Sequence, residues 1–386
     1  MKLPRITFLV HGGPDSIEAI RARGLAQSTP SNCVRFLFRG ADRRLTARAW
    51  AGDLDQHPPN LVYVLNTAMP GAPLMAWRRL NGGVPYLLDT GDVIFEMARR
   101  SGVGAGWRLP VLWVAERFAW RQASRIVVRG TRHRDYLTQR GYPSVLLRDG
   151  YSPAQQVDPQ SVLNLRRQLG LDGRFVVGLL GSLVWSPRLR LCYGWDLIQA
   201  LPLLRDLPIT ALIIGDGSGL GWLKSEAQRL GVLDQIVFAG RIPYAEVPTF
   251  LRTFDVALST QTNNLPGQVR TTGKLPEYMA ASRFILASKV GEAELLLPPA
   301  MLVPYEGEVD LDYPARLALR IRSLMTDPAQ LAEAASLPDI AASRCSYEVL
   351  SREWIRIINT ELRNAHTANQ PGVAPQIPES TVAGTP

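Results

Sequence analysis

The sequence predicts an α/β protein built from two Rossmann-like, doubly wound domains that face a cleft. The chain has 386 residues and is 46% hydrophobic, which is too long for one compact core and indicates two domains. Short β-branched or leucine-rich runs alternate with amphipathic stretches, a rhythm typical of βαβ units around a parallel sheet. A turn-rich segment at 148–153 separates two such series. We therefore predict an N-terminal domain over 1–150 and a C-terminal domain over 151–345.

The apolar runs give the positions of the predicted strands. In the first half they are 6–10, 61–65, 86–89, 125–128 and 144–147, and in the second half 175–180, 210–214, 235–238, 256–259, 284–287 and 301–303. A helix over 158–169, capped by Asp158, opens the second domain. Open α/β sheets bind ligands where the carboxyl ends of their strands face a crevice. The site is therefore expected between the two domains.

The chain ends in an amphipathic helix and a polar tail. A helix is predicted over 347–363 because apolar residues recur on one side of it, and we assign 346–365 to this element. The tail 366–386 is predicted to be disordered, since from 369 onward it is mostly Pro, Gly, Ala, Ser and Thr.

Composition excludes several classes of protein. No apolar run reaches the roughly 18 residues of a membrane-spanning helix, and the N-terminus lacks the apolar core of a signal peptide. These observations favour a cytoplasmic protein. Cys33, Cys192 and Cys345 form no Cys-x-x-Cys pair, and the four histidines stand at unrelated spacings. The sequence therefore argues against structural zinc and disulfides.

The excess positive charge lies in the first half of the chain. Residues 1–150 hold 22 Lys and Arg against 11 Asp and Glu, a net charge of +11, whereas 151–386 hold 21 against 23, a net charge of −2. Such a field attracts an anionic membrane, a phosphorylated substrate or nucleic acid. The alternative is an arginine-rich composition whose charges lie on solvated helix faces, since the chain has only four lysines.

Glycine turns follow several predicted strands. Gly12 and Gly13 come between the first strand and a helix, where backbone amides could hold a diphosphate. The Gly-x-Gly-x-x-Gly pattern of dinucleotide-binding proteins is absent there. A purely structural turn explains the same glycines.

Similar turns recur in the second half. Gly181 ends a strand, and Arg188 and Arg190 follow it in a loop, where a guanidinium can neutralise phosphate. A solvated loop arginine is the alternative for at least one of them. Gly215 ends the next strand, and the turn after that carries Arg241 and Ile242, whose backbone could hydrogen-bond a planar base.

The strongest single element is the segment 273–288. Gly273 and Lys274 stand at a helix start, where free amides and the helix dipole favour an anion. One turn later, the Glu277 carboxylate could accept both hydroxyls of a ribose. The alternative is that Glu277 is an ordinary first-turn residue and that Lys274 stands there by chance.

In this order, the motifs resemble the C-terminal domain of GT-B glycosyltransferases of family 4, also called group 1. They are Gly-Ser at 181–182, Gly-Asp-Gly at 215–217, Phe-Ala-Gly-Arg-Ile-Pro at 238–243, Asp-Val-Ala-Leu-Ser at 255–259 and Lys-Leu-Pro-Glu-Tyr-Met-Ala at 274–280. The resemblance covers about 170–360 well and 1–150 more loosely. It implies that the final helix crosses back onto the N-terminal domain.

The resemblance also implies an activity: retaining transfer from a nucleoside-diphosphate sugar, without an obligatory metal, in the cleft between an acceptor-side N-terminal domain and a donor-binding C-terminal domain. Glu277 matches the carboxylate that holds the ribose, and the amides near Gly273 and Lys274 match the diphosphate ligands. Matching positions assign Gly12, Gly13, Arg241, Ile242 and Gly273 to substrate binding, and we add Gly181, Arg190, Gly215 and Thr272 to this set. The candidate catalytic residues are Asp92, Arg188, Lys274 and Glu277.

The chain departs from the family pattern at two positions. The family pairs two glutamates eight residues apart, and Val269 stands where the first is expected, so a usual contact to the donor sugar is missing. The usual Lys-Gly before the first helix of the second domain is Tyr193-Gly194. We hypothesise that Arg188 or Arg190 supplies the lost positive charge to the leaving diphosphate.

Several aspartates are further candidates for the site. Asp92 follows a strand end in the N-terminal domain and is the candidate acceptor-side carboxylate, with a turn or helix cap as the alternative. The Asp-x-Asp sequences 53–55 and 310–312 match a metal signature of another glycosyltransferase fold. We reject both, because neither stands at a strand end near the donor.

We expect a lipid-linked or cell-surface glycan as acceptor, and the basic N-terminal domain could rest on an anionic membrane. Nucleotide-sugar 2-epimerases share the architecture, but the scarcity of histidine disfavours them. A basic nucleic-acid-binding protein is the non-enzymatic alternative, and the chain lacks the aromatic-interleaved basic stripe or motif of that class.

Overall fold

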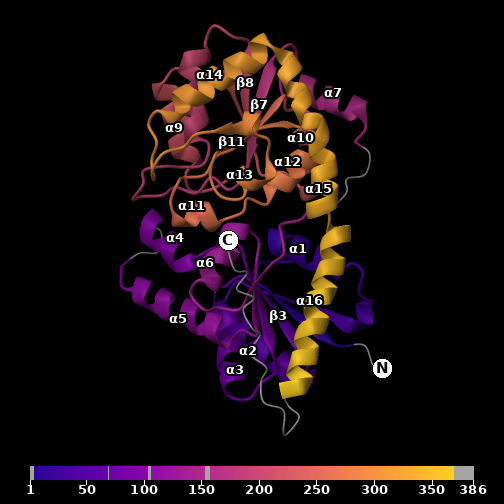
Figure 1. Ribbon diagram of the computed structural model, residues 1–386. Coiled ribbons are helices and arrows are strands. Elements are labelled where there is room, and N and C mark those ends of the chain that lie inside the picture. Colours follow the sequence, from indigo (N-terminus) through magenta and orange to yellow (C-terminus); the bar gives the residue numbers. More distant parts are fainter. Residues whose placement is uncertain (1–3, 68, 103–105, 153–156, 369–386) are drawn as a thin grey trace, which may run out of the picture.

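The computed structural model describes residues 4–67, 69–102, 106–152 and 157–368. The first sheet consists of β1 (Ile6–Val10), β2 (Val34–Phe38), β3 (Leu61–Leu65), β4 (Tyr86–Thr90), β5 (Arg125–Val128) and β6 (Ser144–Leu146). The second consists of β7 (Phe175–Leu180), β8 (Ile209–Ile214), β9 (Ile236–Gly240), β10 (Val256–Ser259), β11 (Phe284–Ser288) and β12 (Leu302–Val303). The two sheets lie one above the other, each between helices (Figure 1).

The two sheets confirm the predicted fold class. The strand orders are β2-β1-β3-β4-β5-β6 and β12-β11-β10-β7-β8-β9, and all pairs of neighbours are parallel. Within each sheet the chain therefore adds strands on both sides of the first strand, β1 or β7. The C-terminal ends of the strands in one sheet face those of the other, because Gly130 after β5 lies against Thr271, in the connection between β10 and β11.

One strand was missing from the predicted set. Residues 34–38 form β2, which pairs with β1 at the edge of the first sheet. All of its residues are only half-buried, and Arg35 interrupts its apolar run. An edge strand needs less continuous hydrophobicity than a central one, so its sequence signal is weak.

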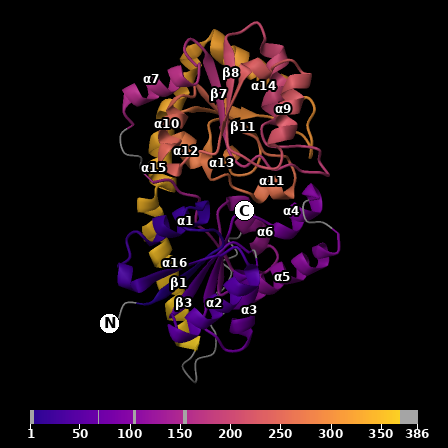
Figure 2. The ribbon, with the colours of Figure 1, turned by 180° about the vertical axis from the view of Figure 1, so that it is seen from behind.

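Helices cover both faces of each sheet (Figure 2). The first domain contains α1 (Ile17–Ala26), α2 (Arg43–Gln56), α3 (Gly71–Leu80), α4 (Ile94–Ser101), α5 (Arg108–Gln122) and α6 (Thr131–Thr138). The second contains α7 (Pro159–Gln168), α8 (Trp195–Ala200), α9 (Leu220–Arg229), α10 (Val247–Arg252), α11 (Leu265–Val269), α12 (Lys274–Ala280), α13 (Ala293–Leu296), α14 (Tyr313–Thr326) and α15 (Leu337–Cys345). The 3-10 segments are Ser31–Cys33, Leu201–Leu204, Leu233–Gln235, Tyr244–Glu246, Pro299–Met301 and Pro328–Ser336. The predicted cap of α7 is present, since Asp158 accepts from the amides of Gln160 and Ser161.

The last helix joins the two domains. α16 (Tyr347–Ala368) follows α15 of the second domain and runs down the first, where it packs against α1. Trp354 stacks on Phe8 of β1 with a centroid separation of 5.4 Å, and Leu350 and Ile358 are buried in the same cluster. Helix α16 is longer than the predicted 346–365, and 369–386 lie outside the described residues. No helix of the described ranges is long and apolar enough to cross a membrane.

Candidate functional site

The strand ends of the second sheet form a tight layer of glycine turns. The amide of Gly181, after β7, donates to the carbonyl of Ile214 at 2.9 Å, and the amide of Gly215, after β8, donates to the carbonyl of Gly240 at 2.8 Å. A Cβ on Gly215 would lie 1.9 Å from the Gly181 carbonyl oxygen, and its φ is +137°. Only glycine fits such a position. The turns thus bring bare backbone to the edge that faces the other domain.

Lys274 lies directly over this layer. Its Nζ is 3.8 Å from the ring centroid of Tyr193, and a Cβ on Gly181 would come within 2.7 Å of the same nitrogen. Burial, together with the charge of Arg270, lowers the pKa of Lys274 to about 7. The second domain therefore presents a partly desolvated amine beside bare backbone, an environment that a bound anion would stabilise.

Glu277 lies one turn farther along α12. Burial raises the pKa of Glu277 to about 7, and the Tyr244 hydroxyl, which bonds to its carboxyl group, and the Lys274 charge act against that rise. Tyr244 is 40% exposed, so the pair stands at the border between the protein and solvent. A carboxyl group so placed can accept hydroxyl donors from a ligand that displaces water.

The predicted anion-binding residues before α12 also lie at this edge. Gly273 is the exposed N-cap residue of the helix and comes near Asp149 of the first domain, with 3.9 Å between its Cβ position and that Cγ. The Thr272 hydroxyl lies 3.3 Å from that of Ser259 at the end of β10. The structure thus brings Thr272, Gly273, Lys274 and Glu277 together with Gly181 and Gly215.

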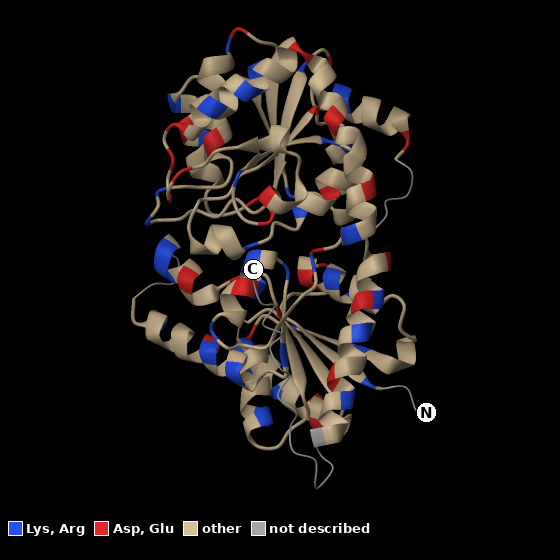
Figure 3. Cartoon of the chain, in the orientation of Figure 1, with Lys and Arg blue, Asp and Glu red and all other residues tan. Residues whose placement is uncertain are grey.

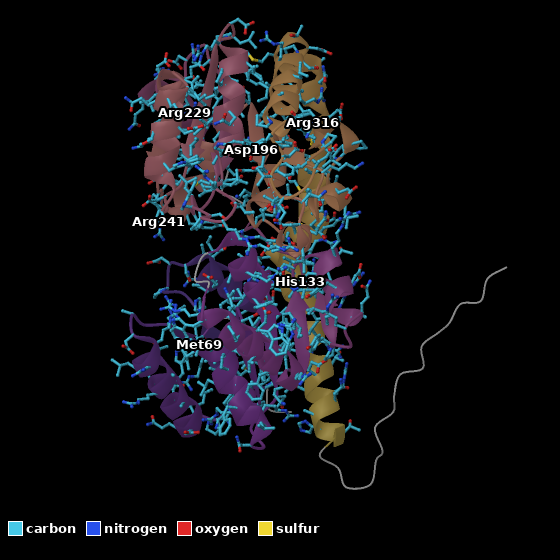
Figure 4. All side chains as sticks on the ribbon, turned by 90° about the vertical axis from the view of Figure 1, so that its left-hand side faces the viewer. Met69, His133, Asp196, Arg229, Arg241 and Arg316 are labelled. Atoms are coloured by element: carbon cyan, nitrogen blue, oxygen red, sulfur yellow. The ribbon has the colours of Figure 1, made fainter. Side chains whose placement is uncertain are left out.

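The predicted base-contacting turn follows β9. Arg241 is exposed and Ile242 packs in part against the core of the second domain. In Figure 4, Arg241 lies at the lower margin of the second domain, at the level of the junction. Tyr244, which contacts Glu277, belongs to the same turn. The turn and α12 are therefore adjacent.

The glycine loop of the first domain differs from its counterparts. Ser16 caps α1 by accepting from the Ala19 amide at 3.2 Å, and its own amide donates to the Gly13 carbonyl at 3.0 Å. A Cβ on Gly12 would meet that of Ser16 at 2.3 Å, whereas a Cβ on Gly13 would meet nothing within 4 Å. Gly12 is therefore required by the turn itself, and Gly13 leaves open space.

Asp92 joins the two domains. Its carboxylate lies 3.2 Å from Nε of Arg270, which follows α11 of the second domain. The N-cap residue of α4 is Val93, with no side-chain cap, so the helix-capping alternative for Asp92 is wrong.

The nearby His133 is fully buried, and neither ring nitrogen has a hydrogen-bond partner among the described residues. Burial lowers the pKa of His133 to about 4, and Figure 4 places it in the upper part of the first domain, near the junction.

A buried ion cluster supports the first domain's strand ends. Asp89 at the end of β4 is 0% exposed and receives Nε of Arg21 at 2.9 Å, the Tyr63 hydroxyl at 2.6 Å and Nε of Arg129 at 3.1 Å. Asp149 lies 3.3 Å from Arg129. Burial acts to raise the pKa of Asp89, but Arg21 and Arg129 outweigh it and hold the pKa low. Sequence analysis missed this cluster because its members are distant along the chain.

A second carboxylate crosses the junction. Glu292 follows β11, is 2% exposed, and accepts from the amide of Thr131 at 2.6 Å, at the start of α6 in the first domain. Nη2 of Arg148 lies 2.9 Å from the same carboxylate. Figure 3 shows lysine and arginine positions on both sides of the junction between the two domains. In the sequence, the one sign that Glu292 could belong to the site is that it follows a strand end.

The two loop arginines do not join Lys274. The amide of Arg188 donates to the Ser101 carbonyl at 3.1 Å and its Nη1 donates to the Arg99 carbonyl at 3.0 Å, both at the end of α4. Arg190 is exposed, with a φ of +52°. No contact among the described residues links either guanidinium to Lys274. Sequence analysis missed Arg270, whose charge contributes to the lowered pKa of Lys274.

The rejected Asp-x-Asp sequences have structural partners. Asp53 and Asp55 lie in α2 and pair with Arg35 and Arg78, each at 2.5 Å. Asp310 accepts from the Asp312 amide at 3.1 Å, just before α14. Among the described residues, no three His, Cys, Asp or Glu side chains are grouped to hold a metal ion.

Val269, which stands where the family pattern has its first glutamate, is buried in the core of the first domain, although it belongs to the second.

Comparison with known proteins identifies the second domain. The family model described as "Glycosyl transferases group 1" matches residues 174–327. The matched residues run from β7 to the end of α14 and thus contain most of the second domain. A 2-deoxystreptamine glucosyltransferase of Streptomyces kanamyceticus is 25% identical over 322 residues, which are 80% of this chain and 75% of that protein. The chain is a glycosyltransferase, and this finding favours that interpretation over the epimerase and the nucleic-acid-binding protein.

Solved structures show the same fold over nearly the whole chain. Anabaena Alr3699/HepE in complex with UDP-glucose has a TM-score of 0.73 at 19% identity, covering 92% of this chain and 100% of that one. WaaG, a glycosyltransferase involved in lipopolysaccharide biosynthesis, has a TM-score of 0.65 at 15% identity, covering 91% and 99%. The glycosyltransferase therefore has the two-domain GT-B architecture.

Proposed function

We propose that this glycosyltransferase moves a sugar, with retention, from a nucleoside-diphosphate sugar to a lipid-linked or cell-surface glycan acceptor. The observation that carries the donor part is the grouping of Lys274, Glu277 and the Gly181 turn at one sheet edge. The diphosphate would lie beside Lys274 and the Gly273 amide, and the ribose hydroxyls would donate to Glu277. The base would lie against the turn at Arg241 and Ile242. The complex of HepE with UDP-glucose supports this class of donor.

Lys274 is the principal catalytic group in this proposal. As the glycosidic bond breaks, the anomeric carbon becomes oxocarbenium-like and the β-phosphate gains negative charge. A fixed cation at that oxygen lowers the barrier, and removing such a group typically costs about 3–4 kcal/mol of transition-state stabilisation. Lys274 stands on the ring of Tyr193, the residue found where the family has lysine, so Lys274 restores the missing charge from another position.

Arg270 and Asp92 complete the catalytic set. Arg270 is near enough to lower the pKa of Lys274 and is held by Asp92 at 3.2 Å. Asp92 would in this way orient the second cation while facing the acceptor from the first domain. The hypothesis that Arg188 or Arg190 supplies this charge predicts a loss of activity when either is replaced. The structure instead holds the Arg188 guanidinium at the end of α4, through the Arg99 carbonyl. Lys274→Met should lower kcat far more than Arg188→Ala or Arg190→Ala.

We further propose that transfer needs no metal ion and that the enzyme works in the cytoplasm, at the inner face of a membrane. Metal independence rests on the charge that Lys274 and Arg270 provide at the diphosphate. Activity should then persist in EDTA. The peripheral location rests on the net charge of +11 over residues 1–150.

The deciding experiment is thermal stabilisation by a panel of nucleoside diphosphates. A ligand at a hundred times its Kd adds about 2.7 kcal/mol, so one nucleotide should raise the Tm of wild type. Glu277→Ala should abolish the shift, whereas Glu353→Ala, an exposed substitution on α16, should leave it intact. No shift with any nucleotide would contradict the proposed donor site. For retention, the anomeric configuration of the first product is read by NMR.

A further inference from the structure

Helices α3 and α5 expose an unusual amount of apolar surface. Pro73, Trp77 and Leu80 stand at helical spacing on α3, and Trp107, Val111, Val114 and Phe118 stand at helical spacing along α5. Trp107 is 78% exposed and Trp77 is 62% exposed. We call these seven residues the α3–α5 face. In a monomeric protein a continuous apolar patch of this kind indicates a surface that contacts something else.

The two apolar stripes border one groove. α3 packs against α5, and the groove between them has a volume of about 400 Å³ and is lined by Pro73, Pro110, Val111, Val114, Ala115 and Phe118. In Figure 1, α5 lies at the left of the first domain, with α4 between it and the second domain, and α3 lies at the lower end of the first domain. The α3–α5 face is therefore separate from the donor site.

The exposed charges that α3 and α5 themselves carry are all positive, although Arg78 pairs with Asp55 of the neighbouring α2. α3 contributes Arg78 and Arg79, α5 contributes Arg108, Arg117 and Arg121, and the only carboxylate of either helix is Glu116, which is buried. The Arg117 guanidinium lies 4.5 Å above the Trp113 ring and that of Arg108 lies 5.5 Å from the Trp107 ring. Among the described residues, Arg108 and Arg121 have no carboxylate partner.

We propose that the α3–α5 face docks on an anionic lipid bilayer. Apolar side chains, exposed tryptophans and unpaired arginines are the combination that an interfacial helix presents to headgroups and the acyl boundary. A protein partner or a second copy of this chain would have to bring carboxylates to match these arginines. α3 and α5 supply no exposed carboxylate themselves, so two copies of the face would repel each other.

The face also has a structural link to the acceptor side. Glu116, on the buried side of α5, accepts from the Phe95 amide at 3.4 Å, at the start of α4 and close behind Asp92. Docking of α5 would therefore fix the orientation of α4, and with it the strand end that carries Asp92, relative to the bilayer. This orientation, though not the docking itself, rests on the proposed function, because it assumes a lipid-linked acceptor facing Asp92.

The test is flotation of the full chain with vesicles of phosphatidylcholine alone or mixed with phosphatidylglycerol. Wild type should bind the anionic vesicles and lose binding as salt rises. Arg108→Gln with Arg121→Gln should weaken partitioning about thirtyfold, and Trp77→Ser with Trp107→Ser should weaken it by at least about tenfold. Arg352→Gln with Arg356→Gln on α16, and Leu311→Ser with Leu319→Ser in the second domain, are matched exposed controls that should bind as wild type does.

Several results would overturn the proposal. They are equal binding to neutral vesicles, unchanged binding in both α3–α5 variants, equal losses in the controls, or a dimer in vesicle-free buffer that the tryptophan variant abolishes. The last result would assign the face to a second copy. The nucleotide-induced Tm shift, measured on the same variants, should stay as in wild type. A failed donor site would remove that shift from every protein, whereas failed docking leaves it intact.

Discussion

The strand ends of the two sheets face each other, and their side chains differ in kind. The second domain offers glycine turns and a partly desolvated lysine, with Gly215 pressed against the Gly181 carbonyl. The first domain offers buried, mutually paired charges around Asp89. Bare amides and an incompletely paired cation are suited to receive an anionic ligand. A cluster of paired buried charges is suited to fix the positions of strand ends, so we infer that one edge binds a ligand and the other supports the fold.

The largest expected effect comes from the supporting edge. Asp89→Ala leaves Arg21 and Arg129 buried without their shared carboxylate, which should lower the free energy of unfolding by about 3–5 kcal/mol. Urea denaturation measures the loss. Asp206→Asn removes the partner of Arg322 in an exposed pair and should change stability little. Similar losses in the two variants would refute the contrast between a structural cluster and surface pairs.

At the edge of the second domain, we expect a change in backbone shape to affect both stability and nucleotide binding. Gly215→Ala places a Cβ against the Gly181 carbonyl at a φ of +137°, so the backbone must move, at a cost of about 1–3 kcal/mol. The same shift should abolish stabilisation by nucleotide. In α9, Gly221→Ala meets no atom within 4 Å and should stabilise the protein by about 0.5–1 kcal/mol. Nucleotide binding that survives Gly215→Ala would show that the turn is not part of the donor site.

The smallest effect is a difference in pH dependence. The folded pKa of Glu277 is about 7, against 4.5 ordinarily, so the folded protein holds a proton that the unfolded chain releases between these values. Stability contributed by Glu277 is therefore full below pH 4.5 and is lost as pH rises to about 7. The pKa of Lys274 is lowered from 10.5 to about 7, so stability should rise from pH 7 toward 10.5. Glu277→Gln should reduce the first slope by the share of one proton and Lys274→Met should reduce the second in the same way, in unfolding curves measured across pH.

The supporting edge should behave differently in the same experiment. Asp89 has a lowered pKa, so its contribution is present above its ordinary value of 3.8 and is lost only as pH falls through the lower folded value. Burial also raises the pKa values of Glu116 and Asp196 to about 7, so the contributions of Glu277 and Lys274 are read as the difference in slope between each variant and wild type. Slopes in the Gln and the Met variants that equal those of wild type would contradict this division.

The local sequence was sufficient wherever a signal is contiguous. The strands at 6–10, 61–65, 125–128, 175–180 and 256–259 have the predicted bounds, because a buried parallel strand is an unbroken apolar run. The group 1 motifs lie in order between 181 and 280, and the strand-turn-helix units that contain them bring Gly181, Gly215, Thr272 and Lys274 together. The half-buried strand β2 was missed because an edge strand carries a weaker pattern.

What the tertiary structure alone decided is the pairing of groups far apart in the chain. Sequence analysis gave Asp92 either an acceptor-side or a capping role, and only the packed domains place it at 3.2 Å from Arg270. The contacts of Glu292 with Thr131 and of Lys274 with Tyr193 arise in the same way. The sequence by itself determined the two parallel sheets and the chemistry available at their edges, since hydrophobic period and turn residues act over a few positions. Which charges meet depends on how the domains dock, because electrostatic partners are chosen by distance in space and not by separation along the chain.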